Sequence, residues 1–142
     1  MHLDIINYIK ADNVKIIYKN TTFQDLVSIS SKNPPKIFII TNTNKKILGV
    51  ITYNDLFAIL LKQMKKNNID CLANQNISKF IAKNYIKVPF NTNTNDVFDM
   101  MMDKKLDYAV VVDDKDFPIG IVDIYTLYDI ILKLKIRNIR LS

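Results

Sequence analysis

The chain has 142 residues, 49% of them hydrophobic, and a formal net charge of +6. This apolar content predicts a core large enough to fold without disulfides or metals. The single cysteine (Cys71) and the single histidine (His2) exclude a disulfide framework, His-rich zinc sites and most Ser-His or Cys-His catalysis. No apolar run approaches the roughly 20 residues that cross a membrane, and the N-terminus lacks the features of a signal peptide. We therefore expect a cytoplasmic protein with no metal and no membrane insertion.

The first half of the chain predicts five elements in the order β-α-β-β-α. Short runs rich in β-branched residues predict strands, and apolar residues at helical spacing predict helices. Thr22 and Asp25 form the pattern of a capping box, with Asp in place of Glu, so a helix is expected from there to about Ser30. The other expected elements are strands at Val14–Tyr18, Ile37–Thr41 and Ile47–Thr52 and a helix at Asn54–Lys66.

The second half predicts the same five elements. Strands are expected at Ile86–Val88, Asp107–Val112 and Ile119–Ile124, with helices after the N-cap Asn93 and at Tyr125–Lys135. Amphipathic segments at Leu3–Lys10 and Ile77–Ala82 precede the first strand of each half. We expect a first repeat at 1–67, a polar linker at 68–76, a second repeat at 77–136 and a basic tail at 137–142 that continues the last helix.

Only two glycines occur in the chain, Gly49 and Gly120, and they lie 71 residues apart. The same shift of 71 aligns the two halves without a gap. Matched glycines in a chain with only two indicate an internal duplication of a unit of about 60 residues. Aligned identical pairs include Thr21 with Thr92, Asp25 with Asp96, Leu56 with Leu127 and Ile59 with Ile130.

The segment Gly49–Leu56, with the sequence GVITYNDL, joins a predicted strand to a predicted helix. Thr52 occupies the N-cap and Asp55 the third helical position, which is the spacing of a capping box. The same geometry suits a nucleoside phosphate. A helix N-terminus and a Thr hydroxyl bind phosphate, and a carboxylate one turn later can accept both ribose hydroxyls. The residue types alone fit both interpretations.

A duplicated β-α-β-β-α unit whose last strand leads into G-V-I-T-x-x-D-L resembles a cystathionine-β-synthase (CBS) domain pair, also called a Bateman module, over nearly the whole chain. The resemblance implies an α+β fold with tandem repeats related by a pseudo-two-fold axis. It also implies a cleft between the repeats that binds AMP, ADP, ATP or S-adenosylmethionine, and a homodimer. The residues that it assigns to the ligand are Thr52 and Lys36 for phosphate, Asp55 for ribose, and Val14, Ile16 and Ile37 for adenine.

The second repeat departs from this pattern. Its sequence GIVDIYTL places Asp123 where phosphate would bind and Thr126 where the ribose would bind, and Asp107 aligns with Lys36. Asp123 still suits an N-cap, but its charge repels phosphate. We therefore expect one nucleotide per chain, centred on Thr52 and Asp55.

The predicted function is a regulatory module that binds an adenine nucleotide as a ligand, has no cofactor, and signals to an effector protein or an attached domain. It is not expected to be an enzyme, since the sequence offers no general base, metal set or activated nucleophile. Two alternatives stay open: a ligand-free structural or dimerisation module, and the N-terminal regulatory part of a larger enzyme or transporter. A nucleic-acid partner is not expected, because 18 of the 20 basic residues are scattered lysines rather than clusters of Arg and Lys.

Overall fold

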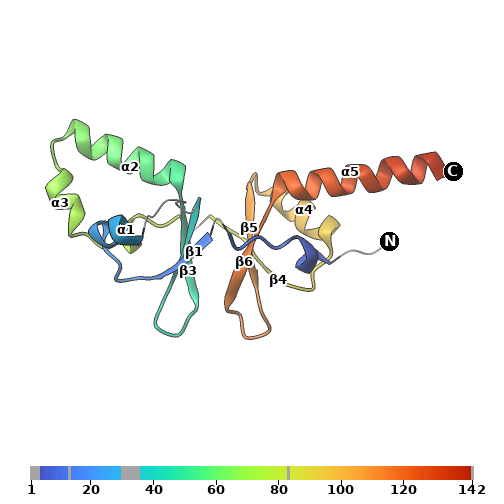
Figure 1. Ribbon diagram of the computed structural model, residues 1–142, viewed down its shortest axis with the longest axis horizontal. Helices are drawn as coiled ribbons and strands as arrows, with labels where there is room; N and C mark the ends of the chain where they lie inside the picture. Colours follow the sequence, from blue (N-terminus) through green and yellow to red (C-terminus); the bar gives the residue numbers. More distant parts are fainter. Residues whose placement is uncertain (1–3, 13, 30–35, 83, 142) are drawn as a thin grey trace. The chain divides into compact units, whose positions relative to one another are not determined.

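The computed structural model describes residues 4–12, 14–29, 36–82 and 84–141. The chain divides into two compact units. We call residues 12–84 the first unit, and residues 1–11 together with 85–142 the second unit. Each unit is a mixed α+β structure built around one three-stranded sheet, which confirms the predicted fold class (Figure 1).

The sheet of the first unit has the strand order β1-β2-β3. β1 (Val14–Tyr18) runs parallel to β2 (Ile37–Thr41), and β2 pairs antiparallel with β3 (Ile47–Thr52). The helices of this unit are α1 (Phe23–Ile29), α2 (Tyr53–Lys65), α3 (Ile69–Ala73) and the 3-10 helix η2 (Ile77–Phe80).

The second unit repeats this arrangement with the strand order β4-β5-β6. β4 (Lys87–Pro89) runs parallel to β5 (Tyr108–Val112), and β5 pairs antiparallel with β6 (Pro118–Asp123). Its helices are α4 (Thr94–Asp103), α5 (Ile124–Leu141) and the 3-10 helix η1 (Ile5–Tyr8).

Each unit has its own hydrophobic core between the sheet and the helices. Alternate side chains of the central strand enter it, as the two-residue period of a strand requires. In the first unit Phe38 and Ile40 of β2 pack with Leu56 of α2, and in the second unit Ala109 and Val111 of β5 occupy the equivalent positions. The alternate apolar side chains of β2 and β5 therefore pack each sheet against the helices of its own unit.

Local signals in the sequence predicted most elements to within two residues. The capping box at the start of α1 is present, with the Thr22 backbone N donating to Asp25 Oδ2 at 2.9 Å. The expected linker contains an additional short helix, α3, and the last helix continues through the expected tail to Leu141. Ser30, where the first helix was expected to end, lies outside the described residues.

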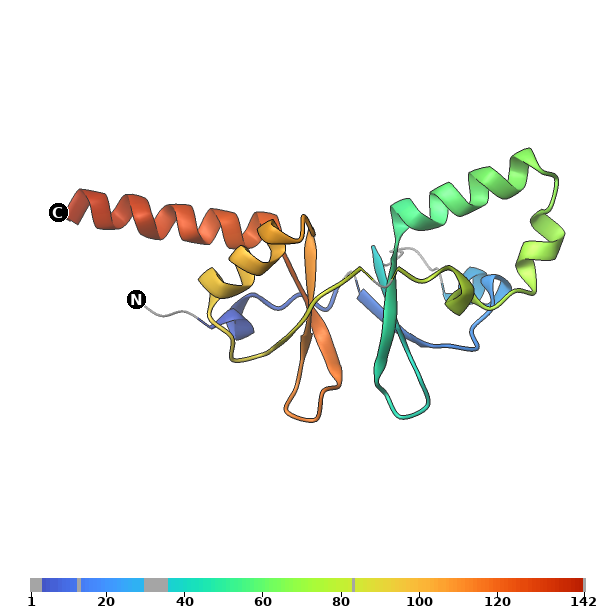
Figure 2. The ribbon, with the colours of Figure 1, turned by 180° about the vertical axis from the view of Figure 1, so that it is seen from behind.

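The segment that precedes each first strand completes the unit of the other repeat. The N-terminal segment runs beside the sheet of the second unit (Figure 2). The backbone N of Lys10 donates to the Ile121 oxygen at 2.8 Å, and the backbone N of Ile121 donates back to the Lys10 oxygen at 3.0 Å. Ala82 and Val50 exchange the same two bonds, at 2.9 and 3.2 Å, in the first unit. These bridges satisfy the free edges of β6 and β3. As a result, the compact units differ from the expected repeats at 1–67 and 77–136.

This exchange explains the positions of the two glycines. A Cβ atom on Gly120 would lie 2.6 Å from Ile9 Cγ2 and 2.8 Å from the Lys10 carbonyl oxygen. A Cβ atom on Gly49 would lie 2.9 Å from the Ala82 carbonyl oxygen. Neither glycine has a positive φ. Glycine is therefore required for the close approach of a crossing segment and not for a turn.

Candidate functional site

The N-terminus of α2 carries the two residues of the predicted nucleotide motif. Thr52 is the N-cap, and its Oγ1 accepts a hydrogen bond from the backbone N of Asp55 at 3.2 Å. Asp55 Oδ2 accepts a bond in return from the backbone N of Thr52 at 2.9 Å. The pair is therefore a complete capping box, as predicted, and both residues are half-buried.

The capping box leaves hydrogen-bonding groups available to a ligand. Thr52 Oγ1 uses a lone pair in the box, so its hydroxyl proton can still be donated to an anion. Asp55 uses Oδ2, and Oδ1 makes no hydrogen bond to any residue that the structure describes. The N-terminus of this 13-residue helix adds a positive partial charge. Capping and ligand binding are therefore compatible at this site.

The strand register places three other predicted residues beside this motif. Val14 pairs with Ile37, and Ile37 pairs with Thr52, so these residues form one row across the sheet. Lys36 directly precedes Ile37, and its carbonyl oxygen accepts a hydrogen bond from the backbone N of Tyr53 at 3.1 Å. Ile37 is buried, Val14 is half-buried and the Lys36 side chain is exposed.

The remaining predicted residue, Ile16, lies two positions along β1 from Val14 and pairs with Ile39. Its side chain is 45% exposed, on the face of β1 opposite to the buried Ile17. The structure thus brings five of the six predicted residues to one end of the sheet and leaves Ile16 two rows away. Their predicted contacts with adenine, ribose and phosphate stay predictions.

The corresponding end of the second unit has the same backbone arrangement with different charges. The backbone N of Ile124 donates to the Asp107 oxygen at 2.9 Å, which repeats the bond between Tyr53 and Lys36. Asp123 Oδ1 accepts from the backbone N of Thr126 at 2.8 Å, and Asp123 Oδ2 accepts from the Thr126 hydroxyl at 2.9 Å. Lys10 Nζ forms an ion pair with the same Oδ2 at 2.8 Å.

Electrostatics differ between the two helix N-termini. Burial acts to raise the pKa of Asp123, but the hydrogen bonds from Lys10 and Thr126 outweigh it and hold that pKa below its ordinary value. The neighbouring Tyr108 has a raised pKa because of burial and then because of the carboxylates of Asp107 and Asp123. The N-terminus of α5 therefore carries an ionised Asp123 that is stabilised by Lys10 and Thr126, with a second carboxylate, that of Asp107, close enough to raise the pKa of Tyr108.

Lys10 is the residue of this region that the sequence interpretation missed. It lies in the segment before the first strand, more than a hundred residues from Asp123, and only the exchange of N-terminal segments brings the two together. The described residues contain no group of three or more His, Cys, Asp or Glu side chains arranged to hold a metal ion. They also contain no helix with the length and hydropathy needed to span a bilayer.

Solved structures share this fold at low sequence identity. The CBS domains of a transcriptional regulator from Streptococcus pneumoniae are 18% identical, with a TM-score of 0.67 over 89% of this chain and 98% of that chain. The protein CBSX2, solved in complex with AMP, is 18% identical, with a TM-score of 0.69 over 93% of this chain and 98% of that one. A Methanocaldococcus jannaschii protein described as a proposed archaeal homologue of γ-AMPK is 17% identical, with a TM-score of 0.70 over 85% of this chain and 47% of that one.

A search of curated protein sequences found no match. The family model of the CBS domain, in contrast, matches this chain twice, at residues 6–62 and 77–133. The two matches are separated by the same 71 residues that separate Gly49 from Gly120. They also contain both helix N-termini that carry the Thr52 and Asp123 caps. The chain therefore belongs to the CBS-domain family and contains two CBS domains in tandem.

Proposed function

We propose that this CBS pair is a cytoplasmic regulatory module that binds an adenosine compound at Thr52 and Asp55. CBS domains generally serve regulation rather than catalysis. The AMP complex of CBSX2 and the M. jannaschii relative of γ-AMPK support an adenine nucleotide as the ligand class. AMP, ADP, ATP and S-adenosylmethionine are the compounds to compare.

The observation that carries the proposal is that the α2 capping box has unused hydrogen-bonding capacity and lies in the sheet row of Val14, Ile37 and Thr52. The Thr52 hydroxyl and the first turn of α2 would bind a phosphate, and Asp55 Oδ1 would accept from the ribose hydroxyls. The carbonyl oxygen of Lys36 accepts a hydrogen bond from Tyr53, the first residue of α2, so the flexible Lys36 side chain would reach an anion bound at the first turn of that helix.

The chain supplies a matched control for this role. Thr22 and Asp25 form a second capping box at α1 with the same two distances, 2.9 and 3.2 Å. Asp55→Ala and Asp25→Ala should each cost about 1 kcal/mol of stability, because each removes one cap. Only Asp55→Ala should weaken nucleotide binding, by about 10- to 150-fold, since a hydrogen bond to a charged acceptor contributes roughly 1.5–3 kcal/mol.

Calorimetric titration with AMP and chemical denaturation measure the two effects separately. Equal AMP affinity in wild type and Asp55→Ala would contradict the ribose role and leave only the cap. Equal losses of affinity in Asp55→Ala and Asp25→Ala would show that binding follows general stability rather than a contact at Asp55.

Signalling would proceed by a shift between conformations. A ligand that binds one conformation better than another stabilises it, and an effector protein or attached domain responds to that conformation. The differential affinity of the ligand for the two states sets the size of the shift.

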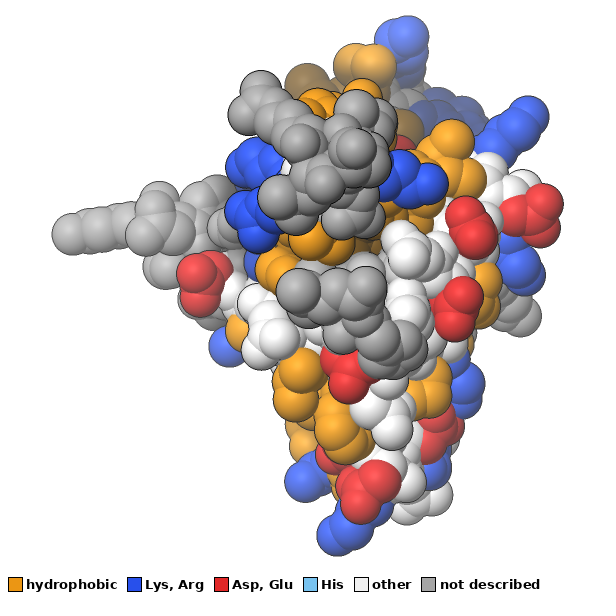
Figure 3. All heavy atoms as spheres, turned by 90° about the vertical axis from the view of Figure 1, so that its right-hand side faces the viewer, with side chains coloured by type: hydrophobic (Ala, Val, Ile, Leu, Met, Phe, Trp, Pro, Cys, Tyr) orange, Lys and Arg blue, Asp and Glu red, His pale blue; other side chains and the backbone are white. Residues whose placement is uncertain are grey.

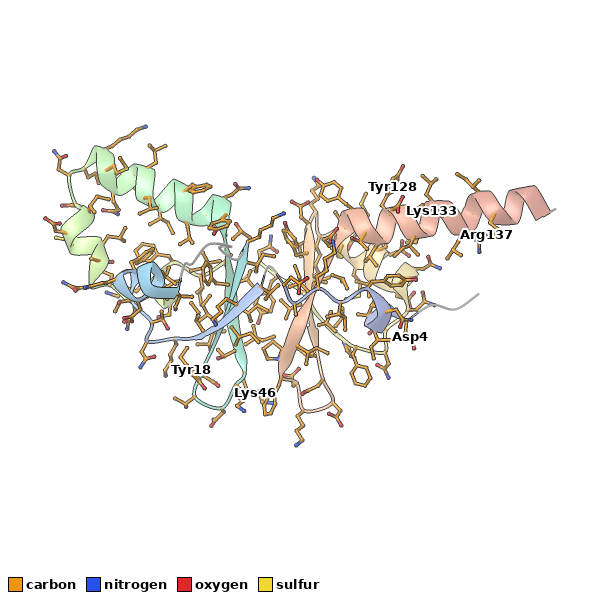
Figure 4. The ribbon with its side chains drawn as sticks, in the orientation of Figure 1. Asp4, Tyr18, Lys46, Tyr128, Lys133 and Arg137 are labelled. Carbon is orange, nitrogen blue, oxygen red and sulfur yellow. The ribbon has the colours of Figure 1, made fainter. Side chains whose placement is uncertain are left out.

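We also propose that the module forms a homodimer through α5. Tyr125, Tyr128, Leu132 and Ile136 are exposed, and their intervals of three and four residues place them on one side of this helix. Figure 4 labels Tyr128 on α5. A second copy offers the same stripe, so the contact is self-complementary about a two-fold axis.

The surface charge does not favour nucleic acid as a partner, because Lys and Arg side chains are interspersed with Asp side chains on the face shown in Figure 3.

A further inference from the structure

A pocket of about 530 Å³ lies within the first unit, between α1, α2, α3 and β2. We call it the apolar pocket. Four aromatic rings line it, and none of the described residues around it is charged. Its volume falls in the range of about 300–1,000 Å³ that is usual for small-molecule sites. The aromatic lining residues are Phe23, Phe38, Tyr53 and Phe57.

The short helix α3 separates α2 from α1 and so forms the pocket. α3 contacts both of these helices, whereas in the second unit α4 packs directly against α5. The chain turns into α3 at Asn67, which has a φ of 56°. The backbone N of Asn68 donates to the Gln63 oxygen at 2.9 Å and that of Asn67 to the Met64 oxygen at 3.2 Å, which is a Schellman motif. The aligned residue Asn138 lies inside the continuous helix α5.

The lining sets the chemistry of an occupant. The rings of Tyr53 and Phe57 are stacked, with centroids 5.6 Å apart and planes 7° apart, and present flat surface to the pocket. A charged ligand would lose its hydration there without gaining a partner of opposite charge. The Tyr53 hydroxyl, which is buried with no hydrogen-bond partner among the described residues, suits an uncharged polar group instead. Phe57, Leu60 and Ile69 are exposed, so solvent reaches the pocket past them, and the exposed Gln24 offers one amide among the lining residues.

We propose that the apolar pocket binds an uncharged small molecule with an aromatic or branched aliphatic body. Such a ligand would pack between the stacked rings and α3 and would leave any polar end near Gln24. The pocket consists of residues of the first unit alone and does not include Thr52 or Asp55. The lining residues therefore differ from the two residues of the nucleotide proposal, although Tyr53 and Leu56 are their neighbours on α2, so the pocket is tested without nucleotide.

The test is a fluorescence titration of the full chain with N-phenyl-1-naphthylamine, an uncharged aromatic dye, without nucleotide. The expected result is saturable binding of one dye per chain. Ala73→Trp, which fills the pocket from α3, and Leu60→Gln, which makes its edge polar, should each weaken binding at least tenfold. Ala58→Trp is the matched control, because Ala58 is exposed on α2 and does not line the pocket.

Circular dichroism identifies a variant that fails to fold, and Leu60→Gln is chosen because Leu60 is 38% exposed and its replacement spares the core. Binding that does not saturate, or that is unchanged in both pocket variants, would overturn the proposal. A fall in dye bound per chain as the protein concentration rises and the chain self-associates would also overturn it, because a second copy would then cover the pocket.

Discussion

Exchanging the two ligand-position residues of the second unit should create a second nucleotide site. The double variant Asp123→Thr/Thr126→Asp restores the order of the first unit, where Thr52 precedes Asp55 by three residues. It moves the carboxylate from position 123, where the side chain is 13% exposed, to position 126, and it frees Lys10, whose ammonium lies 2.8 Å from the Asp123 carboxylate. The cap itself is conserved, since Thr and Asp both serve at the N-cap.

The size of the effect follows from Coulomb's law. A phosphate charge about 4 Å from a carboxylate is repelled by about 1 kcal/mol in water and about 4 kcal/mol at the effective dielectric constant near a protein surface. Removing this repulsion strengthens binding by about 5- to 900-fold. Lys10 then faces the phosphate instead of Asp123 and adds attraction of the same kind.

Calorimetric titration with AMP measures the outcome as stoichiometry. We expect one AMP per chain for the wild type and two for the double variant. Asp129→Thr is the control for the Asp123→Thr half of the exchange, because it makes the same substitution in the same unit on exposed α5 surface, where Asp129 pairs with Lys133. Two equivalent sites in the wild type, or one site in the double variant with Lys10 present, would refute the reasoning.

Three further predictions follow from the two units. The pKa of Asp123 is lowered in the folded state, so its stabilising contribution is present above the unfolded pKa near 4 and is lost as the pH falls through the folded value. Denaturation at several pH values should therefore show a steeper loss of stability below about pH 4 in wild type than in Asp123→Asn; parallel curves would contradict it. Ile5→Ala and Ile77→Ala each remove a fully buried side chain, at a cost of about 2–5 kcal/mol. Amide hydrogen exchange should become faster in the second unit for Ile5→Ala and in the first unit for Ile77→Ala. The reverse pattern would show that each segment packs onto its own repeat instead of the other one. Leu132→Glu should shift the chain from dimer to monomer in sedimentation experiments, whereas an unchanged mass would argue against the α5 interface.

The elements that could be predicted are those with a local cause. Both sheets follow from apolar runs separated by polar turns, and the capping boxes at Thr22 and Thr52 follow from spacing alone. The strand register makes Val14, Ile37 and Thr52 neighbours, whereas their role in binding a ligand stays a prediction. The register of the strands therefore places residues that are distant in the sequence next to one another in the sheet.

The features that were missed depend on contacts distant in sequence. α3 has only five residues, too few for a helix to be stable alone, and it is held by tertiary contacts such as those of Leu72, which is 2% exposed. The partner of Asp123 could not be found by comparing aligned positions, since Lys10 belongs to a segment that folds onto the other repeat's strands. A duplication in the sequence does not specify which copy of a segment completes which unit.

The charges at the two helix N-termini differ at two aligned positions and at a third position that is matched by its bridge to the neighbouring strand. Where the first unit has Lys36, Thr52 and Ala82, the second has Asp107, Asp123 and Lys10; Lys10 and Ala82 correspond because they bridge Ile121 and Val50 in the same way. At these positions the second unit has the carboxylates of Asp107 and Asp123. The ammonium of Lys10 pairs with Asp123, the residue at the position expected for phosphate.

Folding does not select between these two arrangements. Thr52 and Asp123 both receive the backbone N–H of the third helical residue, at 3.2 and 2.8 Å, so either residue begins its helix. The two helix N-termini differ in the groups that they offer to a ligand. At α2 the Thr52 hydroxyl proton and one Asp55 oxygen stay available. At α5 the Thr126 hydroxyl and the Lys10 ammonium both bind the Asp123 carboxylate. Because the two caps are satisfied differently while the two folds remain alike, we propose that a nucleotide would bind at the first helix N-terminus and not at the second.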